Sequence, residues 1–219
     1  FHRRVWQSEA GSNYVKFTLE EKDGMLGFPG NRVFNVTYTL TDSNRLEIHY
    51  HGESDTKTIM NLTNHSYFNL AGHDQAEKAM DQLLSMPARF FTPADAQSIP
   101  TGENRSVEGT PMDFRTPKPI GRDINEDYDA LNLQGGYDHN WEVFCNPCAI
   151  LEDPVSGRTM AVSTDCPGIQ LYAANYTDTV GKGGVPYPKR SGICLETQYF
   201  PDAVHHPEWK QPFTQANVP

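Results

Sequence analysis

Residues 36–50 read VTYTLTDSNRLEIHY, and this stretch has the pattern of a β-hairpin. Two runs rich in β-branched and aromatic residues, VTYTL and RLEIHY, flank the polar turn sequence TDSN. In the second run Leu46, Ile48 and Tyr50 alternate with polar residues, which predicts one buried and one solvated face. The stretch therefore predicts a pair of antiparallel strands.

Short runs of the same kind recur along the chain, at 15–20, 141–144, 159–164, 168–173 and 193–199. The 17 glycines and 16 prolines are spread between these runs and break the chain into short segments. Helical periodicity is nearly absent, and the pattern predicts one short helix at 74–84 and a turn or two of helix at 121–131. Many short strands with few helices indicate an all-β fold, either a large antiparallel sandwich or a barrel.

The composition argues against some classes of binding partner. The chain has 219 residues, which fits a single large all-β domain, and its hydrophobic content of 37% is enough for a packed core. A net charge of −10 argues against binding to nucleic acid or to an anionic membrane, since both need clustered Lys and Arg. No stretch approaches the ~20 apolar residues that span a bilayer. We expect neither nucleic acid nor membrane as a partner.

The cysteines lie at 145, 148, 166 and 194. Cys145 and Cys148 have the two-residue gap of zinc and redox sites, but no second such pair follows. A structural zinc that also uses Cys166 and Cys194 remains an alternative. We favour four reduced thiols in a cytoplasmic protein that holds no metal.

The densest polar cluster is NLTNHSYFNL, at residues 61–70. As a strand, it would place Thr63, His65, Tyr67 and Asn69 on one face. Burying so polar a strand is expensive unless it lines a site, because each unpaired polar group costs about 1–3 kcal/mol. The alternative is an edge strand with a solvated histidine.

A second cluster, GGYDHNW at residues 135–141, combines planar polar groups with an aromatic side chain. This mixture is typical of carbohydrate sites, where polar groups bind ring hydroxyls and an aromatic face covers the C–H patch of the sugar. The planar polar groups of this cluster are Asp138, His139 and Asn140. The alternatives are a metal-binding fragment and a turn capped by Asp and Asn.

Two further strands carry single polar residues in apolar surroundings. Gln170 and Tyr172 share one face of the run PGIQLY, and Glu196 interrupts the apolar run ICLETQYF. Burial tends to raise the pKa of a carboxyl group, which suits a general base that works near neutrality. The alternative for Glu196 is an ion pair with an Arg or Lys.

Together these segments resemble the aldose 1-epimerase, or galactose mutarotase, family over essentially the whole chain. The matching motifs are NLTNHSYFNLAG at 61–72, IPTGE at 99–103, GTPMDFR at 109–115, GGYDHNW at 135–141, SGRTMAVSTDCPGIQLY at 156–172 and SGICLETQYFPDA at 191–203.

The resemblance implies a β-sandwich with a sugar cleft, and an isomerase that interconverts the α and β anomers of hexoses such as glucose and galactose without a cofactor. His65 would be the general acid that protonates the ring oxygen. Glu196 would be the base that removes the proton of the anomeric hydroxyl. Asp138 and Gln170 match positions that bind sugar hydroxyls.

We also expect Asn64, Tyr67 and His139 to contact the substrate, because they lie within the two clusters that carry the resemblance. Family members carry an N-terminal region with an Asn-Arg pair and a Leu-His-Gly-Gly motif, both of which contact substrate, and that region is not found in this sequence. The sequence also stops before the family's closing strand. We therefore expect residues 1–219 to form one domain that is incomplete at both ends; a truncated paralogue with a damaged site is the alternative.

Three other functions compete with this one. A hexose-6-phosphate 1-epimerase would need a basic phosphate pocket, which the acidic balance disfavours. A glycosidase would need two carboxylates that flank one bond, and only Glu196 and Asp138 are available. A non-catalytic sugar-binding or regulatory module would keep the cleft alone. Oligomeric state and the choice between glucose and galactose stay open.

Overall fold

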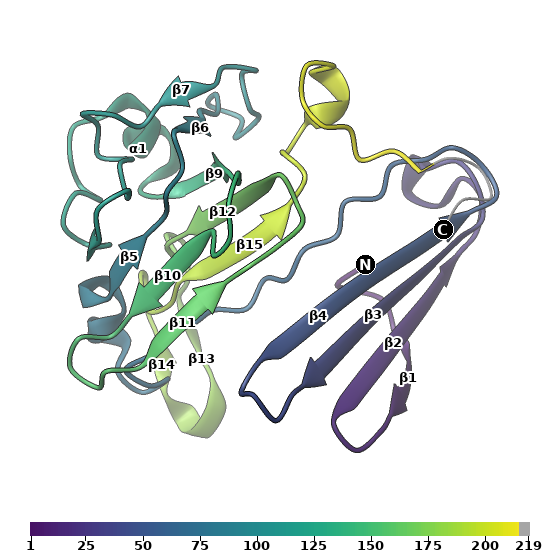
Figure 1. The fold of residues 1–219 in the computed structure, drawn as a ribbon, viewed down its shortest axis with the longest axis horizontal. Helices are drawn as coiled ribbons and strands as arrows, with labels where there is room; N and C mark the ends of the chain where they lie inside the picture. Colours follow the sequence, from purple (N-terminus) through teal and green to yellow (C-terminus); the bar gives the residue numbers. More distant parts are fainter. Residues whose placement is uncertain (215–219) are drawn as a thin grey trace. The chain divides into compact units, whose positions relative to one another are not determined.

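The computed structural model describes residues 1–214, and strands in antiparallel sheets dominate it (Figure 1). The longer strands are β2 (Tyr14–Glu21), β3 (Arg32–Leu40), β4 (Leu46–Ser54), β9 (Asp138–Glu142), β12 (Gly168–Tyr172) and β15 (Cys194–Gln198). The shorter strands are β1 (Gln7–Ala10), β5 (Leu83–Ser85), β6 (Phe90–Thr92), β7 (Arg105–Ser106), β8 (Lys118–Pro119), β10 (Ala149–Glu152), β11 (Thr159–Val162), β13 (Thr179–Val180) and β14 (Pro186–Tyr187). The helical segments are η1 (Met25–Gly27), η2 (Ala76–Asp81), α1 (Asp129–Gln134), η3 (Lys182–Gly184) and η4 (Ala203–His205). The predicted all-β class is confirmed.

The chain forms two compact units, and each is described by itself. The first contains Phe1–Leu62 and the C-terminal residues from Pro212 onward; the second is Thr63–Gln211. No helix among residues 1–214 is long and apolar enough to cross a membrane.

The first unit holds a four-stranded sheet in the order β1-β2-β3-β4. Its β3–β4 hairpin confirms the prediction from residues 36–50, with Val36 paired to Tyr50. Phe34 and Val36 are buried, but Leu46 is 58% exposed because it pairs with Leu40 beside the turn, where the hairpin end is open to solvent. The predicted burial of the Leu46 face is therefore wrong at that end.

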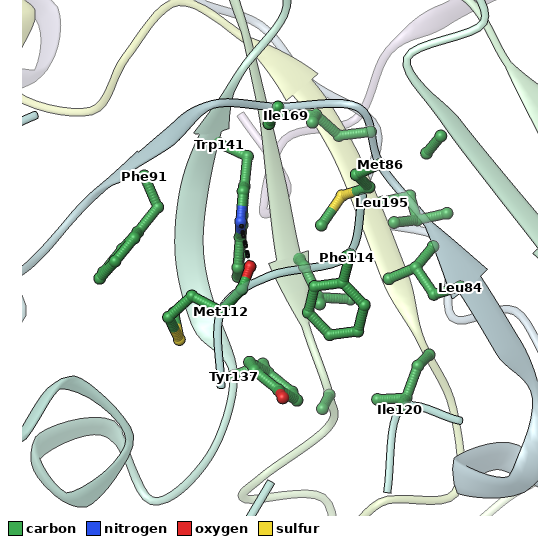
Figure 2. Packing of buried hydrophobic residues seen from close by; sticks show 14 of the residues in the cluster. Leu84, Met86, Phe91, Met112, Phe114, Ile120, Tyr137, Trp141, Ile169 and Leu195 are labelled. Atoms are coloured by element: carbon green, nitrogen blue, oxygen red, sulfur yellow. Dashed lines mark hydrogen bonds between the residues drawn. The ribbon is translucent and has the colours of Figure 1, made fainter. Parts of the chain in front are cut away.

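The second unit holds two larger sheets, with orders β11-β10-β5-β8 and β15-β12-β9-β6-β7. One apolar cluster joins them: Leu84 and Leu151 come from the first sheet, and Ile169 and Leu195 from the second. Trp141 lies near the rings of Phe91 and Phe114, each with its ring centroid 6.0 Å away, and its indole N–H donates to the carbonyl of Met112 at 3.1 Å (Figure 2). This packing gives the sandwich that the sequence predicted.

The helix predicted at 74–84 is only partly present. A 3₁₀ helix spans Ala76–Asp81, but Leu83–Ser85 is a strand that pairs with β10. Leu84 is completely buried in the core, so its packing in the sandwich, and not local helix preference, decides its conformation.

The turn of helix predicted at 121–131 falls later, at Asp129–Gln134. It ends at Gly135, whose φ of 66° is left-handed and whose N–H donates to the carbonyl of Leu131. Glycine takes this conformation without the strain that a Cβ would bring.

The three strands β9, β12 and β15 lie side by side, and their alternation gives the sheet two different faces (Figure 1). Trp141, Leu171 and Leu195 point into the core. The residues between them on each strand must point to the opposite face, because side chains alternate along a strand. That opposite face carries the polar residues that the sequence singled out.

Candidate active site

A cleft of about 360 Å³ lies over this polar face and is formed entirely within the second unit. Its lining residues are His65, Tyr67, Asp138, Gln170, Tyr172, Tyr176, Glu196, Gln198 and Pro201. The volume falls within the range of ligand pockets, about 300–1,000 Å³.

Strand pairing places four of these residues. Gln170 of β12 is directly opposite Glu196 of β15, and Tyr172 is opposite Asp138 of β9. The side-chain amide of Gln170 donates to Asp138 Oδ1 at 2.9 Å. The backbone register therefore brings two carboxyl groups and one amide to the face of the sheet that lines the cleft.

His65 reaches the cleft from a segment that is not a regular strand. The prediction of a strand over 61–70 is wrong apart from one bridge, in which Phe68 N–H donates to Ile193 O at 2.8 Å and Ile193 N–H donates to Phe68 O at 2.9 Å. The side chain of Asn64 accepts from Ser66 N–H at 3.1 Å, and that of Asn69 accepts from Ala71 N–H at 3.1 Å. Such local turns compete with strand pairing.

The imidazole of His65 and the carboxylate of Glu196 face each other across the cleft, with 3.6 Å between Nε2 and Oε1. The Glu196 side chain is almost buried, whereas that of His65 is 51% exposed. The His65 ring stacks on Tyr67 at 5.1 Å and meets the edge of Tyr172 at 5.9 Å. Within residues 1–214 the ion-pair partner of Glu196 is His65, and not the Arg or Lys that the sequence left as an alternative.

The pKa of Glu196 is raised to about 7, chiefly because the carboxyl group is buried; His65 lowers this pKa, and the charge of Asp138 raises it. Burial also raises the pKa of Asp138, and the hydrogen bond from Gln170 opposes this rise. A carboxyl group that titrates near neutrality beside an imidazole can accept and return a proton at physiological pH.

Comparison with known proteins identifies the family. The sequence matches the family described as Aldose 1-epimerase over residues 1–217. The chain belongs to the aldose 1-epimerase family.

Relatives and solved structures agree with this family. The chain is 40% identical over 216 residues to an aldose 1-epimerase of Haemophilus influenzae, covering 96% of the chain and 63% of that relative. It is 40% identical over 218 residues to the human galactose mutarotase, covering 95% of the chain and 61% of that relative. The crystal structure of a GalM/aldose epimerase homologue from C. elegans matches with a TM-score of 0.87 at 27% identity, over 98% of this chain and 65% of that one. The chain thus spans a little over 60% of the length of these curated relatives.

Two residues expected to contact an epimerase substrate lie elsewhere. His139 is 2% exposed on the core side of β9, where its ring meets Phe91 at 5.7 Å and Trp141 at 6.2 Å. Burial lowers its pKa to about 4. Asn64 caps the local turn at Ser66 and is not among the residues that line the cleft. The structure therefore brings Tyr67 to the cleft but does not bring His139 or Asn64 there.

Three residues that line the cleft were not predicted from the sequence: Tyr176, Gln198 and Pro201. Gln198 is two residues beyond Glu196 on β15, so strand alternation could have identified it. Tyr176 lies beyond the end of β12 and is held by its hydroxyl, which donates to Gln134 O at 2.9 Å. That contact joins distant segments and leaves no local signal in the sequence.

The cysteines do not form the zinc site considered as an alternative. All four are free thiols, and only one group of three metal-ligating side chains forms within residues 1–214. It contains Cys194, but with His65 and Glu196 and not with the other cysteines.

Proposed function

We propose that this protein is an aldose 1-epimerase that interconverts the α and β anomers of hexoses such as glucose and galactose. The observation that carries the proposal is the His65–Glu196 pair, 3.6 Å apart in a sugar-sized cleft, with the pKa of Glu196 raised to about 7. Membership of the family and 40% identity to an aldose 1-epimerase and to a galactose mutarotase support it.

The chemistry needs one base and one acid. Ionised Glu196 removes the proton from the anomeric hydroxyl while protonated His65 donates a proton to the ring oxygen, and the bond between C1 and that oxygen breaks. Rotation about C1–C2 then presents the other face of the aldehyde. Ring closure runs both proton transfers in reverse and restores the two side chains. Proton transfers of this kind each contribute about 10²–10⁴-fold to the rate.

Sugar binding uses the remaining lining residues. We propose that Asp138 and Gln170 bind ring hydroxyls, since Gln170 Oε1 is buried and has no hydrogen-bond partner among residues 1–214. Tyr67, Tyr172 and Tyr176 offer aromatic faces for the C–H patches of the sugar.

The charge of the cleft favours an unphosphorylated sugar. Its described lining includes two carboxyl groups, Asp138 and Glu196, and neither Lys nor Arg. A phosphate group would need the opposite charge, so this lining disfavours a hexose 6-phosphate. We also propose a cytoplasmic location, which the free thiols of the four cysteines support.

Polarimetry tests the proposal. Freshly dissolved α-D-galactose and α-D-glucose are followed to equilibrium with and without the protein. We expect the protein to accelerate equilibration and Glu196→Gln to remove the acceleration by about 10²–10⁴-fold. Glu152→Gln is the matched control, because Glu152 is exposed on β10, in the other sheet, and is not among the residues that line the cleft.

Other outcomes identify the competing functions. Sugar binding without any acceleration would favour the binding module. Acceleration confined to glucose 6-phosphate would favour the phosphosugar epimerase, and release of a reducing end from a disaccharide would favour a glycosidase.

A further inference from the structure

Three metal-ligating groups lie close together, and two of them, His65 and Glu196, line the cleft. His65 Nε2 or Nδ1, Cys194 Sγ and a carboxylate oxygen of Glu196 all lie within 4.8 Å of one another. Cys194 and Glu196 are two residues apart on β15, so both side chains leave the same face of the strand. The thiol has no role in the proposed proton transfers, although it lies directly beside the groups that perform them.

We propose that His65, Cys194 and Glu196 form a site for a borderline-soft divalent cation, Zn²⁺ in particular, which excludes the sugar and inhibits the enzyme. The inhibition rests on the proposed function. The binding of the metal does not, because it depends only on the three side chains.

The distances suit zinc. Bonds of about 2.0–2.3 Å in a tetrahedral arrangement separate neighbouring ligand atoms by roughly 3.3–3.8 Å. His65 Nε2 and Glu196 Oε1 are already 3.6 Å apart. The largest separation in the group, 4.8 Å at most, needs a shift of about 1 Å. His65 can supply that shift because its side chain is half exposed.

The ligand set selects the class of metal. One sulfur, one nitrogen and one carboxylate oxygen suit Zn²⁺ and similar transition metals, whereas Mg²⁺ and Ca²⁺ prefer oxygen ligands alone. On binding, the metal replaces the thiol proton of Cys194, which passes to solvent, and the metal–sulfur bond forms. The thiolate and the Glu196 carboxylate then neutralise the two positive charges of the ion.

The surroundings also favour a cation. Asp138 is near enough for its charge to act on both Cys194 and Glu196. The exposed side of His65 leaves a fourth coordination position open to water from the cleft. A metal in this position would occupy the His65 nitrogen and the Glu196 oxygen, the two atoms that the sugar requires, so metal and sugar should exclude each other.

Calorimetric titration of the metal-free protein with ZnCl₂ is the direct test, with cobalt as a spectroscopic probe. We expect one Zn²⁺ per chain, and a thiolate-to-metal absorption band when Co²⁺ replaces it. Cys194→Ala should weaken Zn²⁺ binding by at least about tenfold and remove the band. Cys145→Ala is the matched control, since Cys145 is an exposed thiol outside the group, and it should change neither.

The kinetic arm uses the mutarotation assay. Zn²⁺ should raise the apparent KM for galactose without lowering kcat, EDTA should reverse the effect, and Mg²⁺ should have none. Unchanged Zn²⁺ affinity in Cys194→Ala, or a Co²⁺ complex of the unmodified protein without a thiolate band, would overturn the site. If the protein has no epimerase activity, calorimetry and the cobalt spectrum still decide the metal site separately from the proposed function.

Discussion

Gln170 and Glu196 are directly paired across β12 and β15, and on the other side of Gln170 its strand neighbour is Asn140 of β9. These side chains leave the sheet on the same face, because directly opposite residues of an antiparallel pair share a face. The position of the proposed base is thus set by the backbone pairing of β15, the edge strand of a five-stranded sheet, with β12. This rigid support fits a group that must hold one geometry through ring opening and closure.

The pH dependence of the reaction follows from the pKa of Glu196, which is raised to about 7. The base must be ionised, so kcat/KM for mutarotation should rise with pH through about 7. The charge of Asp138 contributes to that raised pKa, so Asp138→Asn should move the inflection to lower pH, whatever it does to KM. A profile that is flat from about pH 5 to 9, or an inflection that Asp138→Asn leaves in place, would contradict this assignment.

The same raised pKa predicts a cost in stability. In the unfolded chain Glu196 has the ordinary pKa of a glutamate, 4.5, whereas in the folded protein its pKa is about 7. Between these pH values the folded state binds more protons, so the contribution of Glu196 to stability falls as pH rises. Glu196→Gln should therefore raise the free energy of unfolding by about 1–3 kcal/mol at pH 8 and change it little at pH 4.5.

Urea unfolding at the two pH values checks this prediction. Glu152→Gln removes a charge from an exposed strand position and should leave the free energy unchanged at both. A Glu196→Gln protein less stable than the unmodified one at pH 8 would show that the carboxylate stabilises the fold.

Two residues of the candidate site could be predicted from the strand pattern. Gln170 and Glu196 are polar residues in apolar runs, and the structure places both side chains on the face of the sheet that lines the cleft. Alternation also argues against His139 as a cleft residue, because it follows Asp138 directly and must point the other way. The prediction for His139 rested on its residue type, a histidine beside an aspartate, and not on the alternation of side chains along the strand.

Two features of the cleft were not predicted from the sequence. The segment around His65 departs from a strand because Asn64 and Asn69 accept hydrogen bonds from backbone N–H groups two residues further on, and a single bridge at Phe68 fixes it beside β15. Tyr176 reaches the cleft through a hydrogen bond to the carbonyl of Gln134, a residue of the short helix before β9. The bridge at Phe68 and the contact of Tyr176 depend on tertiary packing, which no local pattern shows.

Strand β12 should tolerate no side chain at Gly168, which lies on the same face of the strand as Gln170. A Cβ there would lie 2.3 Å from Asn140 Oδ1 and 2.8 Å from the ring of Phe200, and both of these side chains are buried. Because neither can move away freely, Gly168→Ala should lower the free energy of unfolding by about 1–3 kcal/mol. Thermal or urea unfolding measures the loss, and an unchanged stability would mean that Asn140 can reorient without penalty.

A buried lysine outside the cleft gives a further prediction. Lys118 is 2% exposed, and its Nζ donates to Asp123 Oδ2 at 2.7 Å and to the carbonyl of Pro111 at 2.6 Å. Asp123→Asn would leave the ammonium group buried without its counter-charge, so the free energy of unfolding should fall by about 3–5 kcal/mol. Adding Lys118→Met to this variant should recover part of the loss, as measured by urea unfolding.

Acid should reproduce the effect of Asp123→Asn. The hydrogen bond from Arg122, together with Lys118, lowers the pKa of Asp123 from 3.8 to about 2, so the pair contributes its full stability above pH 4. That contribution is lost as pH falls through about 4 towards 2, and the difference between the unmodified protein and Asp123→Asn should shrink over the same window. Arg122→Gln is the control, because the Arg122 side chain is 58% exposed and a surface partner contributes about 0–1 kcal/mol. An equal loss from Arg122→Gln and Asp123→Asn would show that the surface ion pair, and not the buried lysine, stabilises this region.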